Sequence, residues 1–123
     1  MAAPNGAVAE AYIDASGVHV RVRAGDPLDE VVLRSYCIGA AHMAIGWVTS
    51  EGIAVDEGGA PLDLTIRSFG VLRAVDTPAI TVEIDDDGSP PRNGSDAVFA
   101  AVAAAVWRAQ GCPPTFPTGR MLR

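Results

Sequence analysis

The sequence contains no lysine, only two cysteines and few aromatic residues. Its nine basic residues are all arginines scattered along the chain, and the net charge is −6. An acidic chain without a basic cluster is not expected to bind nucleic acid. The first residues lack a basic leader segment, and no apolar run approaches the roughly 20 residues of a membrane span. The composition therefore predicts a soluble cytoplasmic protein without a membrane partner.

The two cysteines, Cys37 and Cys112, lie far apart and have neither a CxxC spacing nor a metal-ligand spacing. This pattern argues against a disulfide, a zinc site and an iron–sulfur cluster, so we expect buried free thiols. The acidic run Asp85-Asp86-Asp87-Gly88 lacks the spaced ligands and the distant glutamate of a calcium-binding EF-hand loop. We interpret it as a solvated turn and predict no metal held by this chain alone.

Alternation of apolar and polar residues predicts a hairpin over residues 8–23. Its second strand places valines on one face and polar residues on the other, namely Val18, Val20 and Val22 against His19, Arg21 and Arg23. Further short strands are expected at residues 53–55, 62–64 and 80–84 because turn-forming residues separate them. Residues 53–55 and 62–64 would form a second hairpin.

Two helices are expected. The first has Asp26 as its cap and Pro27 in its first turn, and it runs to about Ser50. It is rich in small residues, namely Gly39, Ala40, Ala41, Ala44 and Gly46. Gly39, His42 and Gly46 share one face, which another backbone or a ligand could approach closely. The second helix is alanine-rich and runs from Ser95 to the residues before Gly111.

Together these elements predict an α+β fold in which a small mixed sheet of hairpins packs with two main helices, about 27–50 and 95–110. We divide the chain into a flexible N-terminus (1–7), a single domain (8–111) and an extended, proline-rich tail (112–123) that is free to lie across a partner.

Four segments carry a resemblance to a known family. They are Gly25-Asp26-Pro27-Leu28, Ile45-Gly46-Trp47-Val48-Thr49-Ser50-Glu51, Leu64-Thr65-Ile66-Arg67-Ser68-Phe69 through Asp76-Thr77-Pro78, and Asn93-Gly94-Ser95-Asp96. With the predicted elements between them, they resemble the C-terminal portion of the molybdopterin-binding large subunit of the xanthine dehydrogenase and aldehyde oxidase (molybdenum hydroxylase) family. The resemblance spans about residues 8–111, nearly the whole chain.

The resemblance implies a small subunit of a heteromeric molybdenum hydroxylase that helps to form or close the molybdopterin site. The reaction would be oxidative hydroxylation of a heterocycle or aldehyde by an oxidoreductase complex, and this chain would not be active alone. The implied partners are the remaining portion of the molybdopterin-binding subunit and an iron–sulfur subunit, with an FAD subunit left as an open alternative. The alternatives are a non-catalytic scaffold that kept the fold and lost the chemistry, and a homodimer without cofactor.

The same resemblance points to site residues. Ser95 stands where the family has a catalytic glutamate, so no catalytic residue is assigned, although the neighbouring Asp96 could substitute for it. Tyr36 falls near the family's pterin-contacting glutamine. The residues expected to contact the molybdenum–molybdopterin cofactor are Asn93, Gly94, Ser95, Tyr36, Gly39 and His42.

Each candidate also has an ordinary structural explanation. Ser95 and Asp96 suit the N-cap and first turn of the second helix, and a single histidine such as His42 is more often a core residue than a ligand contact. Arg67 and Arg73 flank an apolar segment and could hold an anionic group, but surface ion pairs are the simpler expectation.

Overall fold

The computed structural model describes residues 1–122. Its elements are β1 (Val8–Asp14), β2 (Gly17–Arg23), α1 (Glu30–Thr49), the short 3-10 helix η1 (Ala74–Asp76), β3 (Ile80–Asp85) and α2 (Ser95–Ala109). β1 and β2 pair antiparallel, and β3 pairs parallel to β2, which gives a three-stranded mixed sheet in the order β1-β2-β3. The predicted α+β class, with a mixed sheet and two main helices, is confirmed.

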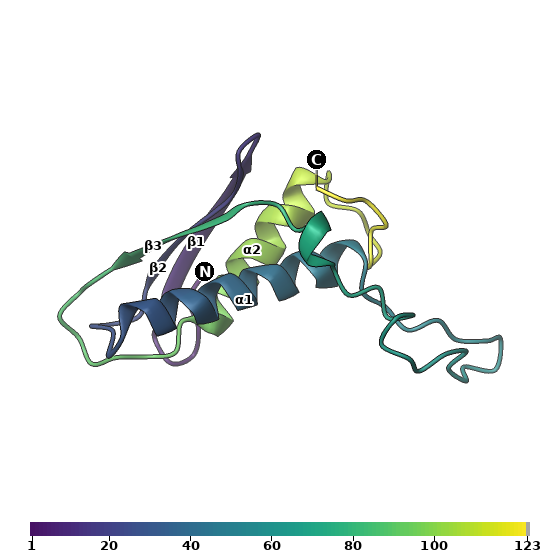
Figure 1. Ribbon diagram of the computed structural model, residues 1–123, viewed down its shortest axis with the longest axis horizontal. Helices are drawn as coiled ribbons and strands as arrows, with labels where there is room; N and C mark the ends of the chain where they lie inside the picture. The colour runs from purple at the N-terminus through teal and green to yellow at the C-terminus, as the bar shows by residue number, and fades with distance from the viewer. Residues whose placement is uncertain (123) are drawn as a thin grey trace.

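The alternation in β2 determines which face of the sheet is covered. Val18, Val20 and Val22 are buried, and α1 and α2 pack against each other and against this face (Figure 1). The opposite face carries exposed polar residues such as Glu10, Arg21 and Glu83. A one-residue slip of the strand register would turn the valines to solvent, so the hydrophobic pattern fixes the register.

Small side chains let the two helices come close together. The buried residues of α1 include Ala40, Ala41 and Ala44, and those of α2 include Ala97 and Ala101. Alanine at a helix–helix contact shortens the distance between the two backbones, and the core is accordingly built mainly from alanine and valine. Close packing was the expected role of the small residues of α1, and the alanines fulfil it.

The start of α1 differs from the prediction by one turn. Asp29, not Asp26, is the N-cap, and its carboxylate accepts a hydrogen bond from the backbone N–H of Val32 at 3.1 Å. Both aspartates satisfy the capping preference. Asp26 is instead engaged by a distant loop, where it accepts a hydrogen bond from the backbone N–H of Gly88 at 3.0 Å.

By length and composition, α1 is apolar enough to cross a membrane, with a mean hydropathy of 1.3. The expectation that no segment approaches such a span is therefore wrong for this helix. Within the protein, however, 44% of the apolar window is buried. A helix packed into a protein core commonly has this composition, so the feature is explained by the packing of α1 on the sheet and α2.

The second hairpin does not form regular strands. Between α1 and η1 the chain makes a long excursion away from the sheet and helices (Figure 1). Its only bridge among the described residues joins Val55 and Pro61. A hairpin without a core beneath it is marginal, which explains why the local turn signals did not produce a ladder.

Both ends of the chain fold back on the domain. The N-terminal ammonium of Met1 donates to the carbonyl of Ala9 at 2.7 Å. In the tail, the backbone N–H groups of Thr118 and Gly119 donate to the carbonyls of Val48 and Thr49 at the end of α1, at 2.8 and 2.9 Å. The tail thus satisfies carbonyls that the helix C-terminus leaves open, and it lies against its own chain.

Candidate functional site

The first turns of α1 and the loop before α2 enclose a groove of about 410 Å³. Its walls are formed by Pro27, Leu28, Asp29, Val32, Leu33 and Tyr36 on one side and Pro91, Arg92 and Asn93 on the other. Tyr36 and Asn93, two of the predicted site residues, are thus brought together although they lie far apart in sequence. We take this groove as the candidate site.

Backbone contacts hold the loop against the segment that precedes α1. The N–H of Arg92 donates to the carbonyl of Ala24 at 2.7 Å, and the N–H of Asp26 donates to that of Ser89 at 2.9 Å. Gly25 makes this approach possible, because it has φ +76 and a Cβ there would lie 2.2 Å from the carbonyl oxygen of Pro90. The groove is therefore fixed by its backbone.

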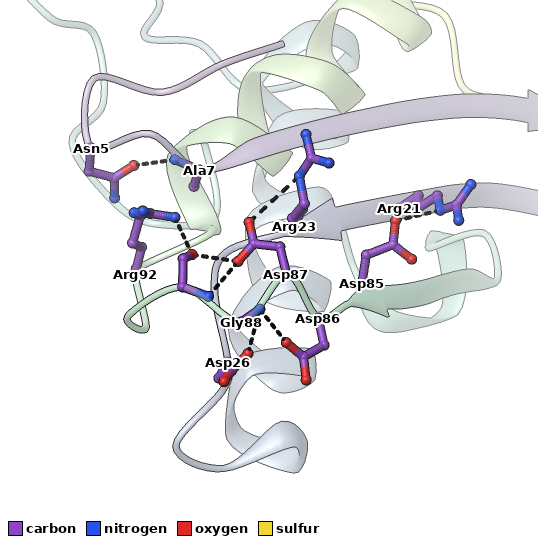
Figure 2. Close-up of polar contacts among 11 residues, drawn as sticks. Asn5, Ala7, Arg21, Arg23, Asp26, Asp85, Asp86, Asp87, Gly88 and Arg92 are labelled. Atoms are coloured by element: carbon purple, nitrogen blue, oxygen red, sulfur yellow. Dashed lines mark hydrogen bonds and ion pairs between the residues drawn. The ribbon is translucent and has the colours of Figure 1, made fainter.

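An acidic cluster of Asp26, Asp86 and Asp87, with Arg23 and Arg92 close by, lies where the loop before α2 meets the segment before α1 (Figure 2). The carboxylates of Asp26 and Asp86 both accept from the N–H of Gly88, at 3.0 and 2.8 Å. The hydrogen bond between these carboxyl groups raises the pKa of Asp26 and lowers that of Asp86, so Asp26 is the first of the two to take up a proton as the pH falls.

The third acid of this run, Asp87, faces Ser89 and Arg23. Hydrogen bonds from the Ser89 hydroxyl and backbone N–H lower the pKa of the Asp87 carboxyl. Arg92 donates to the same hydroxyl at 2.9 Å, which links the acidic turn to the groove wall (Figure 2). Among residues 1–122, no group of three or more His, Cys, Asp or Glu side chains is placed to hold a metal. This acidic segment is therefore a turn whose backbone N–H groups are hydrogen-bonded by its own side chains.

At the start of α2, the capping residue differs from the prediction. Gly94, not Ser95, is the N-cap, and no side chain of the described residues caps the helix. The side-chain oxygen of Asn93, one residue earlier, accepts from the backbone N–H of Ser95 at 2.8 Å. Asp96 lies in the first helical turn, as expected, and is exposed. Neither Ser95 nor Asp96 lines the groove.

The other expected cofactor contacts lie outside the groove. Gly94 is buried, and a Cβ there would lie 3.0 Å from a methyl group of Val22. His42 is half-buried, and its Nε2 lies 3.0 Å from the carbonyl oxygen of Leu72. Since a carbonyl can only accept, Nε2 carries the proton, and the structure favours a packed, hydrogen-bonded histidine. Gly39 is exposed on α1, with nothing within 4 Å of a built Cβ.

The two arginines of the apolar segment behave differently. Arg73 forms an ion pair with Asp76 at 2.6 Å, which agrees with the simpler expectation for it. Arg67 and Arg73 both line a second hollow of about 390 Å³ beside Ser50, Gly70 and the end of the chain. Because Arg73 is paired with Asp76, this hollow offers an anion less positive charge than the sequence suggests.

Chemically, the groove combines a mainly apolar floor with the guanidinium of Arg92, the amide of Asn93 and the phenol of Tyr36. The carboxylate of Asp29 also lines it but caps α1, so it is poorly placed to act as a base. The sequence interpretation missed Arg92, although its position next to Asn93 in the loop was a usable signal. The groove is suited to contact a ligand's edge and not to carry out proton transfer.

The comparisons with known proteins concern the fold. No protein-family model matches the chain, and no curated protein matches it. Among solved structures, the chain is similar to the Cu,Mo-CO dehydrogenase, with a TM-score of 0.60 and 18% identity over 71% of this chain. It is also similar to quinoline 2-oxidoreductase from Pseudomonas putida 86, with a TM-score of 0.64 and 20% identity over 72% of this chain. In each case it covers 12% of the other chain. The fold is therefore that of a small part of these much longer chains.

Proposed function

We propose that this chain is a small subunit of a heteromeric molybdenum hydroxylase and that its groove forms one wall of the molybdopterin site. The remaining portion of the molybdopterin-binding subunit would be a separate chain, with an iron–sulfur subunit and an FAD subunit completing the complex. The reaction would be oxidative hydroxylation of a heterocycle or an aldehyde.

The observation that supports this proposal is the similarity of the fold to parts of two molybdenum-enzyme and oxidoreductase structures. Two solved structures with this fold are a molybdenum-containing dehydrogenase and a quinoline oxidoreductase, and this chain spans 12% of each. The resemblance of four sequence segments points to the same family. Tyr36 and Asn93, both assigned to the cofactor from that resemblance, line one groove.

The residues of the groove fit one wall of a cofactor site and do not fit the whole cofactor. Among residues 1–122, Arg92 is the one cationic residue that lines the groove, whereas molybdopterin carries a phosphate as well as the metal centre. The rest of the lining is largely apolar, which suits contact with a flat ring edge. Most of the groups that hold the cofactor must come from another chain, and we assign no reaction step to this one.

Purification from the native host tests the proposal. The tagged chain should bring down a larger chain, identified by peptide mass spectrometry, together with molybdenum detected by elemental analysis. A tagged Tyr36→Ala, Asn93→Ala double variant should retain the partner chain and hold less molybdenum. If the tagged wild-type chain comes down alone and without molybdenum, the proposal is wrong.

A second candidate function, a non-catalytic scaffold of the same fold, is favoured by Ser95. A serine hydroxyl stands where the resembled family has a carboxylate base, and neither Ser95 nor Asp96 lines the groove. Ser95→Ala and Asp96→Ala variants separate the two roles in the assembled complex. Unchanged turnover for both variants would show that this loop does no chemistry, whereas a large loss for Asp96→Ala alone would identify it as the substitute for the glutamate.

A further inference from the structure

The only two asparagines of the chain are each followed by glycine, at Asn5-Gly6 and Asn93-Gly94. An asparagine before glycine is prone to spontaneous deamidation, because glycine has no Cβ to hinder the approach of its backbone nitrogen to the side-chain carbonyl carbon of the asparagine. Both asparagines are exposed to solvent. The reaction needs no reagent other than water, so the structure around each pair determines which of them reacts.

The two asparagine side chains make the same local turn. The side-chain oxygen of Asn5 accepts from the N–H of Ala7 at 3.0 Å, as Figure 2 shows. The side-chain oxygen of Asn93 accepts from the N–H of Ser95 at 2.8 Å. A hydrogen bond to the residue two positions on folds the asparagine side chain back over the intervening glycine and polarises its carbonyl group. In this respect the two pairs are matched.

Further hydrogen bonds distinguish the two pairs. At the first pair, the N–H of Gly6 donates to the carbonyl of Ala3 at 2.9 Å, and the side-chain nitrogen of Asn5 donates to the carbonyl of Asn93 at 2.9 Å. The attacking nitrogen and the leaving group are therefore both held. At the second pair, neither the N–H of Gly94 nor the side-chain nitrogen of Asn93 donates a hydrogen bond to any group within residues 1–122.

We propose that Asn93 is a site of spontaneous deamidation and that Asn5 is protected from the same reaction. The backbone nitrogen of Gly94 gives up its proton and attacks Cγ of Asn93, which forms an N–Cγ bond. The Cγ–Nδ2 bond breaks, and the amide nitrogen leaves with that proton as ammonia. Water then opens the succinimide ring at one of its two carbonyls, which gives aspartate or isoaspartate. Nothing is oxidised or reduced, and the inference does not depend on the proposed function.

The two products have different effects on the start of α2. Aspartate keeps an oxygen for the N–H of Ser95, and its negative charge lies at the positive end of the helix dipole. Isoaspartate adds a methylene group to the backbone ahead of Gly94. This glycine is buried, and a Cβ on it would lie 3.0 Å from a methyl group of Val22. Isoaspartate should therefore displace the loop that forms one wall of the groove, whereas aspartate should leave the loop in place.

The experiment measures the deamidation rate at each site in the same full-length chain. The purified protein is incubated at mildly alkaline pH, and its tryptic peptides are analysed by mass spectrometry at intervals. Asn5 and Asn93 fall on different peptides, because arginines lie between them, so each peptide reports one site. A sample digested without incubation corrects for reaction during digestion. The same incubation in urea gives the two rates in the unfolded chain.

In the folded chain, Asn93 should deamidate about tenfold faster than Asn5, because two hydrogen bonds must first open at Asn5 and each lowers the reactive population severalfold. In urea the two rates should become similar, since both sites are then Asn-Gly pairs in an unfolded chain. Equal rates in the folded chain, or a faster rate at Asn5, would overturn the proposal. So would an Asn93 that stays intact in the folded chain and reacts only in urea.

Asn93→Asp supplies the aspartate product directly and serves as the matched control. Its thermal midpoint should equal or exceed that of the wild type. The isoaspartate fraction of the incubated protein, separated by ion exchange and recognised by an isoaspartyl methyltransferase, should unfold at a lower temperature. An isoaspartate fraction as stable as Asn93→Asp would overturn the predicted displacement of the loop. In this variant Asn5 should still react slowly, because the carbonyl it contacts belongs to the backbone.

Discussion

The side-chain oxygen of Asn93 lies 2.8 Å from the backbone nitrogen of Ser95 and accepts its hydrogen bond. Asn93 thereby joins two roles, because its side chain bonds the first backbone N–H of α2 and Asn93 also lines the groove. A residue that holds the start of a helix at the edge of a site couples the site's shape to the stability of the fold. The hydroxyl of Ser95 takes no part in this hydrogen bond.

Substitution of Asn93 by alanine should therefore lower the free energy of unfolding by about 1 kcal/mol, the net contribution of a typical intramolecular hydrogen bond. Ser95→Ala should change it by less than about 0.5 kcal/mol, as for a typical surface substitution. Urea unfolding of the isolated chain, followed by circular dichroism, measures both. An equal or larger loss for Ser95→Ala would show that the hydroxyl of Ser95, and not the amide of Asn93, stabilises the start of α2.

Two glycine-to-alanine substitutions should have opposite signs. Gly39→Ala should stabilise the chain by about 0.5–1 kcal/mol, because Gly39 lies in a helix interior and nothing lies within 4 Å of a built Cβ. Gly94→Ala should destabilise it by about 1 kcal/mol or more, because the new methyl would lie 3.0 Å from Val22 and 3.5 Å from Ala24. The same urea titration measures both, and a destabilising Gly39→Ala would contradict the exposed position of that residue.

The Asp26–Asp86 pair predicts a stability change with pH. The hydrogen bond from the neighbouring carboxyl raises the pKa of Asp26 in the folded state. A carboxyl with a raised folded pKa stabilises the fold at low pH, and this stability is lost as the pH rises from the ordinary carboxyl pKa of 3.8 through the raised pKa. Asp26→Asn keeps an oxygen for the N–H of Gly88 and cannot ionise. It should therefore be more stable than the wild type at pH 7.

The difference between the wild type and Asp26→Asn should vanish in acid below the unfolded-state pKa, where Asp26 is protonated in both states. Urea midpoints measured at pH 7 and in acid test this directly. Because both carboxyls are exposed to solvent, the effect should weaken in high salt. If Asp26→Asn is less stable than the wild type at pH 7, the two ionised carboxylates of Asp26 and Asp86 do not destabilise the fold.

The parts of the fold that the sequence predicted are those determined by local pattern. The valine alternation placed β2 correctly, and the alanine-rich run placed α2 from Ser95. The cap of α1 was misassigned because Asp26 and Asp29 are equivalent in local sequence. Contacts with a loop about 60 residues away, from the N–H of Gly88 and to the carbonyl of Ser89, hold Asp26 away from the capping position.

The predicted second hairpin failed for a related reason. Turn-forming residues around Asp56 were recognised, and they do form a turn. Strands, however, also need a surface on which to bury their apolar side chains, and this chain provides none beneath residues 52–68. At the site, two residues selected from the family resemblance, Tyr36 and Asn93, line one groove, and their contact with a cofactor stays a prediction. The resemblance could not reveal that Gly94 packs on Val22 or that His42 reaches the carbonyl of Leu72, because those contacts depend on tertiary packing.

The cysteines offer a measurement of local opening. Both were expected to be buried, but only Cys37 is, since its side chain is 0% exposed and Cys112 lies exposed in the tail. Burial raises the pKa of the Cys37 thiol, which further slows its reaction because the thiolate is the nucleophile. A maleimide should therefore label the Cys112 thiol rapidly and the Cys37 thiol only when the domain opens. Cys112→Ser should abolish the rapid phase.

The Gly94→Ala substitution gives this labelling experiment a structural control. The built Cβ at Gly94 lies 3.7 Å from the sulfur of Cys37, so the crowded variant should open more often at this point and label Cys37 faster. Gly39 lies on the same helix as Cys37 but faces solvent, so Gly39→Ala should leave the slow labelling rate of Cys37 unchanged or reduce it. Rapid labelling of two thiols in the wild type would contradict the burial of Cys37. A slow rate that Gly94→Ala does not alter would mean that the loop before α2 does not control access to the core at Cys37.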